Sequence, residues 1–203
     1  MSSHQPIILA ITGGIACGKS EAGRILSQEG FSILDTDLLA HEIMSTGTPV
    51  FERVVEAFGK TILSTEGEVD RTKLGQLVFS NPAVRETLNG LVHPAVIQET
   101  EEWKAKQQGD AAVLVPLLFE AGWTEGWDAI VCVSADEKQI FQRLGKRGLS
   151  EGEARKRIAA QMPLAEKEAK ADFVIRNNET LNALHEETLK VIECIRSKGN
   201  DHE

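Results

Sequence analysis

Residues that form metal or disulfide sites are scarce in this 203-residue sequence. The three cysteines, Cys17, Cys132 and Cys194, lie far apart and form no C-x-x-C pair. This spacing predicts neither a disulfide framework nor a zinc site, and it suits a reducing compartment. None of the five histidines has metal-ligand spacing, and the three tryptophans are too scattered to form a platform for stacking bases.

Long hydrophobic runs are also missing. The N-terminal apolar run follows no cationic stretch and is too short for a signal peptide, and no segment approaches the length of a membrane span. A net charge of −9 gives no general electrostatic reason to bind nucleic acid or anionic lipid. We therefore expect a cytoplasmic protein that binds neither nucleic acid nor a membrane. The sequence leaves the oligomeric state open.

One segment has the pattern G-x-x-x-x-G-K-S, which is typical of a loop that binds phosphate groups. The glycines let successive backbone N–H groups point at a phosphate. Lys19 supplies a mobile positive charge for the outer phosphates, and Ser20 offers a hydroxyl to a magnesium ion at the start of a helix. The loop consists of Gly13, Gly14, Ile15, Ala16, Cys17, Gly18, Lys19 and Ser20.

The surroundings of this loop favour a functional interpretation. An apolar run at 7–11 predicts a strand before it, and 21–29 predicts a helix that stops at Gly30. The alternative is a glycine-rich turn before an ordinary helix. The loop by itself does not separate a kinase from an ATPase or a GTPase. We interpret Cys17 as a small space-filling residue, with a redox role as the alternative.

Strand and helix signals alternate along the chain. This alternation predicts a five-stranded parallel sheet wrapped by helices, with ligands at the carboxyl ends of the strands. Residues 38–108 are too long for a single crossover, so we predict an inserted helical subdomain there. The expected strands are 7–11, 31–34, 111–118, 129–133 and 173–175. The expected helix breaks are Gly47-Thr48-Pro49, Gly59, Gly67, Asn81-Pro82 and His93-Pro94.

Two aspartates follow the second predicted strand. If the strand continues through Asp35-Thr36-Asp37, both carboxylates point the same way, toward the phosphate loop. One carboxylate near an acceptor hydroxyl and one near a magnesium ion would serve phosphoryl transfer. The alternatives are ordinary turn chemistry and an N-cap role for Asp37 ahead of a helix at Leu38.

A basic segment interrupts this acidic chain. Residues 138–157 hold seven lysines and arginines against two glutamates. Arg143 and Arg147 are spaced to share a helix face, and Ser150-Glu151-Gly152-Glu153 predicts a capping box at the start of a helix that ends near Met162. We interpret the segment as a lid that brings cations to a transferring phosphoryl group. The alternative is a solvated helix face.

Nearly the whole chain resembles the dephospho-coenzyme A kinase family. The phosphate loop is common to many families, whereas V-P-L-L-F-E and the pattern x-x-R-x-x-L-G-x-x-V-F are more particular to this one. The resemblance is carried by 11–20, Leu34-Asp35-Thr36-Asp37, 67–79 (GEVDRTKLGQLVF), Leu91-Val92-His93-Pro94, 115–120 (VPLLFE), 157–162 (RIAAQM) and 171–178 (ADFVIRNN).

This resemblance implies a P-loop, nucleoside-monophosphate-kinase-like fold. It implies a single kinase domain over 1–203, with core segments 6–37, 109–143 and 166–198, an acceptor-binding subdomain at 38–108 and a lid at 144–165. The implied activity is ATP- and Mg²⁺-dependent transfer of the γ-phosphate to the ribose 3′-hydroxyl of dephospho-coenzyme A, the final step of coenzyme A biosynthesis.

Site residues are carried over by position in the same way. Asp37 is the implied base with Asp35 beside it, Lys19 holds the phosphates and Ser20 the metal, and Arg143 is a catalytic cation at the lid edge. Further implied ATP contacts are Glu21, Arg147, Arg157, Asn177 and Asn178. Implied acceptor contacts are His41, Arg71, Leu74, His93, Pro116 and Leu117, besides the two aspartates.

The sequence departs from the family pattern in three places. Ala16-Cys17 replaces the usual Gly-Ser, and because both residues are small we expect the loop to close. Glu21 stands where a threonine is common, which puts an acid near anionic phosphates. Arg176 and Glu179 replace the Asp and Gly that usually flank the two asparagines, which affects the adenine side of the predicted site.

Two other functions compete with this interpretation. A different small-molecule kinase of the same fold shares the loop and lid but does not explain the stretches at 67–79 and 115–120. A GTP-binding switch or ATP sensor is the second alternative. The chain has no N-K-x-D run for guanine, and a sensor needs neither an acceptor site nor a basic lid.

Overall fold

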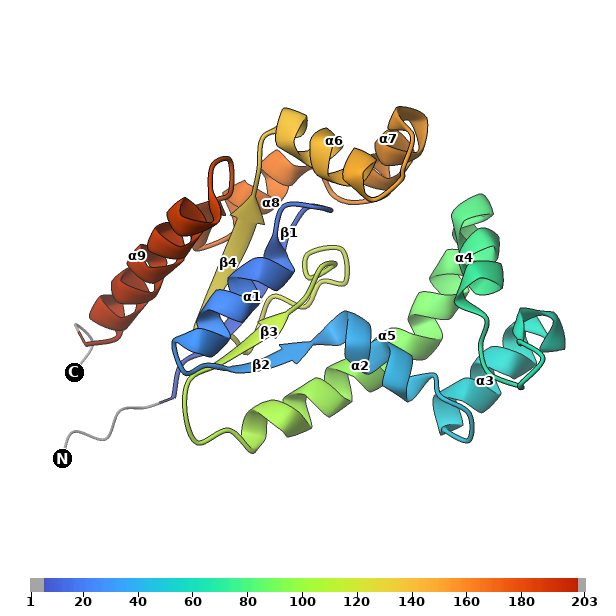
Figure 1. Cartoon of the computed structure of the whole chain (residues 1–203). Coiled ribbons are helices and arrows are strands. Elements are labelled where there is room, and N and C mark those ends of the chain that lie inside the picture. The colour runs from blue at the N-terminus through green and yellow to red at the C-terminus, as the bar shows by residue number, and fades with distance from the viewer. Residues whose placement is uncertain (1–5, 201–203) are drawn as a thin grey trace. The chain divides into compact units, whose positions relative to one another are not determined.

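A computed structural model of the chain describes residues 6–200, so positions 1–5 and 201–203 of the predicted domain lie outside it. Five parallel strands form one sheet, as the sequence predicts, and their order is β2-β3-β1-β4-β5 (Figure 1). The strands are β1 (Ile8–Gly13), β2 (Ser32–Asp35), β3 (Ala111–Leu114), β4 (Ala129–Ser134) and β5 (Phe173–Arg176).

The chain divides into two compact units. The first comprises the residues through Asp35 and from Gln107 onward, and the second is Thr36–Lys106. The first unit contains the sheet and five helices of the described chain. These are α1 (Lys19–Gln28), α6 (Glu137–Lys146), α7 (Glu151–Ala159), α8 (Leu164–Lys170) and α9 (Leu181–Asn200).

Apolar side chains from strands and helices form the core of the first unit. Leu9 and Ile11 of β1 pack with Ile25 of α1 and Leu184 of α9, all of them almost completely buried. Helices α1 and α9 lie side by side against the sheet (Figure 1). This packing fixes the start of α1, and with it the loop that joins β1 to α1.

Three aspartates set the starts of the strands. Asp110, just before β3, accepts a hydrogen bond from Ile7 N–H at 3.1 Å. Asp172, just before β5, accepts one from Ile130 N–H at 2.7 Å. Asp128 does the same for Ile8 N–H at 2.6 Å. Each carboxylate satisfies a donor at the open end of a neighbouring strand, which anchors the parallel register.

The second unit is helical, with a small core of its own. Val54 and Ile62 are completely buried there, and Leu74, Val92 and Val96 pack around them. Its helices are α2 (Thr36–Ile43), α3 (Pro49–Phe58), the short 3₁₀ helix η1 (Lys60–Ile62), α4 (Arg71–Ser80) and α5 (Pro82–Ala105).

Four predicted boundaries are wrong. The break at His93-Pro94 does not occur, because α5 continues through Pro94 at the cost of one backbone hydrogen bond. The strand at 111–118 ends at Leu114, ahead of a proline that has no N–H to donate. Helix α7 starts at its predicted capping box but stops at Ala159, short of Met162. Helix α2 begins at Thr36, two residues before Leu38.

Among the described residues, none of the helices combines the length and the apolar character that a membrane span requires.

The three thiols differ in exposure, and this predicts their reactivity. Cys17 and Cys132 are completely buried, whereas Cys194 is exposed. Burial raises the pKa of the Cys17 thiol, and it raises the pKa of Cys132 to about 12. Because only the thiolate reacts, we expect iodoacetamide at pH 8 to label Cys194 in the native protein and all three cysteines after denaturation. Peptide mass spectrometry checks this, and native labelling of Cys17 as fast as that of Cys194 would contradict it.

Candidate active site

The phosphate loop lies against the sheet so closely that two of its glycines have no room for a side chain. A Cβ atom on Gly13, whose φ is +141°, would stand 2.1 Å from the backbone oxygen of Val133 in β4. One on Gly18, whose φ is +110°, would stand 2.2 Å from Nδ2 of Asn177. Gly18 also precedes the first turn of α1. The predicted need for glycine at these positions therefore has a steric cause as well as a conformational one.

Ala16 shows that small size is only part of what the loop requires. Its φ is +57°, and it is the one non-glycine residue between 6 and 200 with a positive φ. For a residue with a Cβ atom this left-handed conformation costs roughly 1–2 kcal/mol. The loop closes as expected, but it does so with strain that glycine at this position would avoid.

Lys19 folds back over the loop. Its Nζ donates hydrogen bonds to the carbonyl oxygens of Gly13 at 3.1 Å and Gly14 at 3.0 Å. The charge is thus held beside the first two residues of the loop, and its predicted contact with the outer phosphates stays a prediction. Ser20 is exposed in the first turn of α1, where the helix dipole favours an anion.

Arg143 and Asn177 brace the loop from outside. The Arg143 guanidinium donates to the backbone oxygens of Ala16 at 3.2 Å, Cys17 at 3.3 Å and Asn177 at 2.8 Å. Asn177, which is buried, donates from Nδ2 to the Cys17 oxygen at 2.8 Å and accepts from Arg143 at Oδ1. Asn178 accepts from the N–H of Asp136 at 2.7 Å. The predicted adenine contacts of both asparagines stay predictions, since the observed partners are protein groups.

The other basic residues of the predicted lid lie on or beside helices α6 and α7. Arg147 follows the last residue of α6 and Arg157 lies on α7, and both are exposed. Arg155 pairs with Glu151 at 2.7 Å and lies 4.9 Å over the ring of Phe141, which ties α7 to α6. The lid role of these residues stays a prediction.

Glu21 has a partner that the sequence interpretation missed. Arg24, one helical turn later, donates to its carboxylate at 2.7 Å. This hydrogen bond lowers the pKa of Glu21 and places a positive charge beside it. The acid near the phosphate loop is therefore partly compensated, and an i,i+3 charge pair in the sequence was the signal for it.

Asp35 and Asp37 occupy different kinds of structure. Asp35 ends β2 in register with Leu114 of β3, so it lies at the same edge of the sheet as the phosphate loop. Asp37 lies in the first turn of α2, because the helix starts at Thr36. The alternation of side chains along a strand does not apply to this pair, and Asp37 is not the N-cap. Their predicted roles remain untested by this geometry.

A buried cation lies beyond the end of β3, and sequence reasoning missed it. Lys167 of α8 is completely buried, pairs with Glu120 at 2.8 Å and donates to the backbone oxygen of Pro116 at 2.8 Å. The segment LAEKEAK has the composition of an exposed helix and carries no signal for this burial. Loss of the Glu120 carboxylate would leave this buried ammonium without its counter-charge, which is destabilising. Pro116 and Leu117 are thereby held in a fixed turn, while their acceptor contact stays a prediction.

The second unit contains a cavity of about 300 Å³. Three predicted acceptor residues, His41, Arg71 and Leu74, line it together with apolar side chains such as Met44 and Val69. The structure thus brings together residues that lie 30 positions apart in the sequence.

His93 is not among the described residues that line this cavity. It is half-buried in α5, and burial lowers the pKa of its imidazole. Its predicted acceptor contact therefore stays a prediction.

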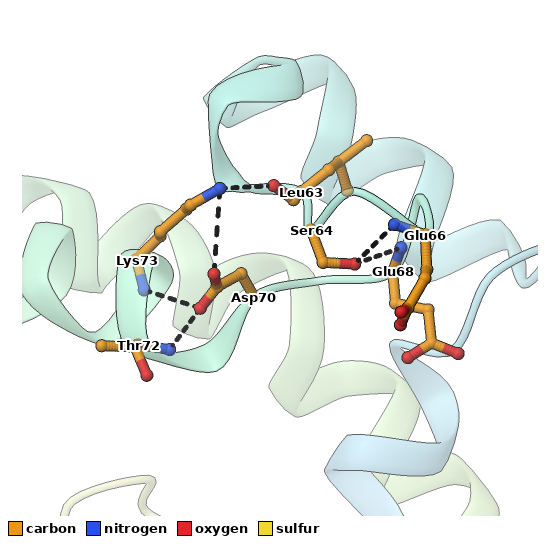
Figure 2. Close-up of polar contacts among 7 residues, drawn as sticks. All are labelled: Leu63, Ser64, Glu66, Glu68, Asp70, Thr72 and Lys73. Carbon is orange, nitrogen blue, oxygen red and sulfur yellow. Dashed lines mark hydrogen bonds and ion pairs between the residues drawn. The ribbon is translucent and has the colours of Figure 1, made fainter.

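A capped turn positions the wall of the cavity (Figure 2). Asp70 is the N-cap of α4 and accepts from the N–H groups of Thr72 and Lys73 at 2.9 and 3.1 Å. The Lys73 ammonium donates to the backbone oxygen of Leu63 at 2.7 Å, and Ser64 accepts from the N–H groups ahead of the turn (Figure 2). The stretch at 67–79 thus sets the first turn of α4, where Arg71 lies. An aspartate before a helical segment was the signal for this cap.

Comparison with known proteins identifies the family. A family model described as dephospho-CoA kinase matches residues 7–183. The dephospho-CoA kinase of Carboxydothermus hydrogenoformans is 40% identical over 92% of this chain and 93% of that relative. The Arabidopsis thaliana dephospho-CoA kinase is 43% identical over 93% of this chain and 84% of that relative.

A solved structure agrees with these sequence matches. The dephospho-CoA kinase from Campylobacter jejuni superposes with a TM-score of 0.66 and 30% identity, covering 95% of this chain and 98% of that one. The matches span the phosphate loop, the sheet and the helical unit alike. The chain therefore belongs to the dephospho-CoA kinase family.

Proposed function

We propose that this chain transfers the γ-phosphoryl group of ATP to the ribose 3′-hydroxyl of dephospho-coenzyme A, giving coenzyme A and ADP. The observation that carries the proposal is the family match over residues 7–183, which contains a closed phosphate loop braced by Arg143 and Asn177. The reaction is the last step of coenzyme A biosynthesis.

In this proposal the phosphate loop holds ATP. Its N–H groups donate hydrogen bonds to phosphate oxygens, and Lys19 moves from its loop carbonyls to the outer phosphates. Bound magnesium would neutralise charge on those phosphates. The Ser20 hydroxyl and the Asp35 carboxylate suit it, because Mg²⁺ takes hard oxygen donors and needs few from the protein when phosphates supply the rest. The lack of a larger ligand cluster among the described residues is compatible with that chemistry.

Asp37 is the proposed base. A carboxylate hydrogen-bonded to the 3′-hydroxyl orients it for in-line attack and accepts its proton as the bond to phosphorus forms. The proposed acceptor site extends to the cavity of the second unit, whose mixture of apolar side chains with Arg71 and His41 suits a molecule that has an alkyl amide arm and anionic phosphates. His93, Pro116 and Leu117 remain proposed acceptor contacts.

A coupled assay of ADP release tests this proposal. MgATP alone, or with adenosine or AMP, should give little ADP, and dephospho-coenzyme A should stimulate release strongly. Stimulation by adenosine or AMP instead would replace the acceptor while keeping a kinase. If no acceptor stimulates release, a regulatory ATP sensor becomes the better interpretation.

Asp37→Asn should reduce kcat by about 10²- to 10⁴-fold, because the amide cannot accept the hydroxyl proton. The dissociation constant for MgATP should stay near that of the wild type, measured by calorimetry on the same preparation. Near-normal turnover in this variant would mean that Asp37 is not the base.

Arg143 and Arg147 should respond differently to replacement by alanine. Arg143→Ala removes hydrogen bonds to three backbone carbonyls and should lower both thermal stability and kcat/KM for ATP, the latter by about 10- to 100-fold. In the lid interpretation Arg147 brings a cation to the transferring phosphoryl group, so Arg147→Ala should reduce turnover. Because Arg147 is exposed, the same substitution should leave the melting temperature unchanged. The lid assignment would be refuted if Arg147→Ala changed only the melting temperature.

Arg71→Ala should raise KM for dephospho-coenzyme A by about 10-fold, the value of one charge-assisted hydrogen bond, and leave KM for ATP unchanged. Arg85→Ala is the matched control, because Arg85 is an exposed arginine of the same unit outside the cavity lining. Equal effects of both substitutions on the acceptor KM would argue against the cavity as the acceptor site.

A further inference from the structure

The connection between α7 and α8 reaches back to the phosphate loop. The backbone N–H of Ile15, third residue of the loop, donates a hydrogen bond to Oε1 of Gln161 at 3.0 Å. Gln161 lies 146 positions away and belongs to the segment predicted as the lid. Of the loop's N–H groups, one is therefore already occupied by a side chain.

The residue after Gln161 is anchored independently. The N–H of Met162 donates to the Glu120 carboxylate at 2.9 Å, and Glu120 pairs with the buried Lys167. The backbone of the connection can therefore stay in place while the half-buried Gln161 side chain rotates away from Ile15. Only one side-chain hydrogen bond has to break.

A phosphate oxygen and the Gln161 oxygen compete for the same hydrogen. The Ile15 N–H carries one proton, and an anionic acceptor binds it about twice as strongly as a neutral carboxamide. The hydrogen bond to Gln161 satisfies this partly buried donor, which would otherwise be costly.

We propose that Gln161 is a nucleotide-responsive latch. It holds the Ile15 N–H when the loop is empty, and the terminal phosphate of ATP displaces it, which breaks the hydrogen bond between the loop and the connection of α7 to α8. The inference rests on the proposed function only in requiring that the loop binds ATP. The identity of the acceptor does not enter it.

The sign of one affinity change tests the latch. Isothermal titration calorimetry with Mg²⁺ and the non-hydrolysable analogue AMP-PNP gives the dissociation constants of wild type, Gln161→Ala, Gln161→Glu and Gln142→Ala. Gln161→Ala removes the competitor and should bind about two- to tenfold more tightly than wild type. Gln161→Glu keeps an acceptor for Ile15 and adds a negative charge, so it should bind more weakly than wild type.

Gln142→Ala is the matched control, because Gln142 is an exposed glutamine on α6, and it should bind like wild type. If Gln161→Ala binds AMP-PNP more weakly than wild type, Gln161 supports the loop, and the latch is wrong. If it binds equally well, Gln161 has no effect on nucleotide binding, and the latch is again wrong. If Gln161→Ala is unstable, the affinity of Gln161→Glu for AMP-PNP tests the proposal instead. Weaker binding than wild type is expected, and unchanged or tighter binding would overturn the proposal. Loss of stimulation by dephospho-coenzyme A with the predicted affinity order intact would refute the acceptor and leave the latch standing.

Discussion

The close approach of the phosphate loop to the sheet is the constraint on which the candidate active site depends. A Cβ atom at Gly13 would collide with the backbone of Val133 in β4, so the loop can lie where it does only because glycine stands there. That position follows from the parallel register of β1 with β4, which the carboxylates of Asp128 and Asp172 help to anchor at the other end of the strands. The geometry of the phosphate cradle is thus set by sheet pairing.

The basic segment at 138–157 contributes structural contacts as well as positive charge. Arg143 directs its guanidinium to backbone carbonyls of the loop and of β5's end, and Arg155 joins α7 to α6, so two cations of the basic segment have structural partners. Arg147 and Arg157 are exposed members of that segment, as Arg155 also is. A basic run that resembles a uniform lid therefore includes residues that brace the fold as well as exposed cations.

Polar contacts also connect segments that the sequence separates widely. Lys167 holds the turn at Pro116 and the carboxylate of Glu120, Glu120 holds Met162, and the neighbouring Gln161 reaches the phosphate loop. The chain of contacts runs from the end of β3 to the phosphate loop through the ion pair of the buried Lys167. Because a buried charge is costly to leave unpaired, this pair provides an anchor beside which one side chain is able to move.

The sequence by itself determined the phosphate loop and the capping box of Ser150, since each depends on residues that are neighbours along the chain, and the alternation of strand and helix signals indicated the parallel sheet. It misjudged the end of β3, which stops ahead of Pro116, and the continuity of α5, which runs through Pro94. Only the tertiary structure decided that Lys167 is buried, that Arg143 donates hydrogen bonds to the loop and that Gln161 accepts one from the Ile15 N–H. These contacts join residues more than 45 positions apart, so they depend on how the helices pack on the sheet, which local patterns do not encode.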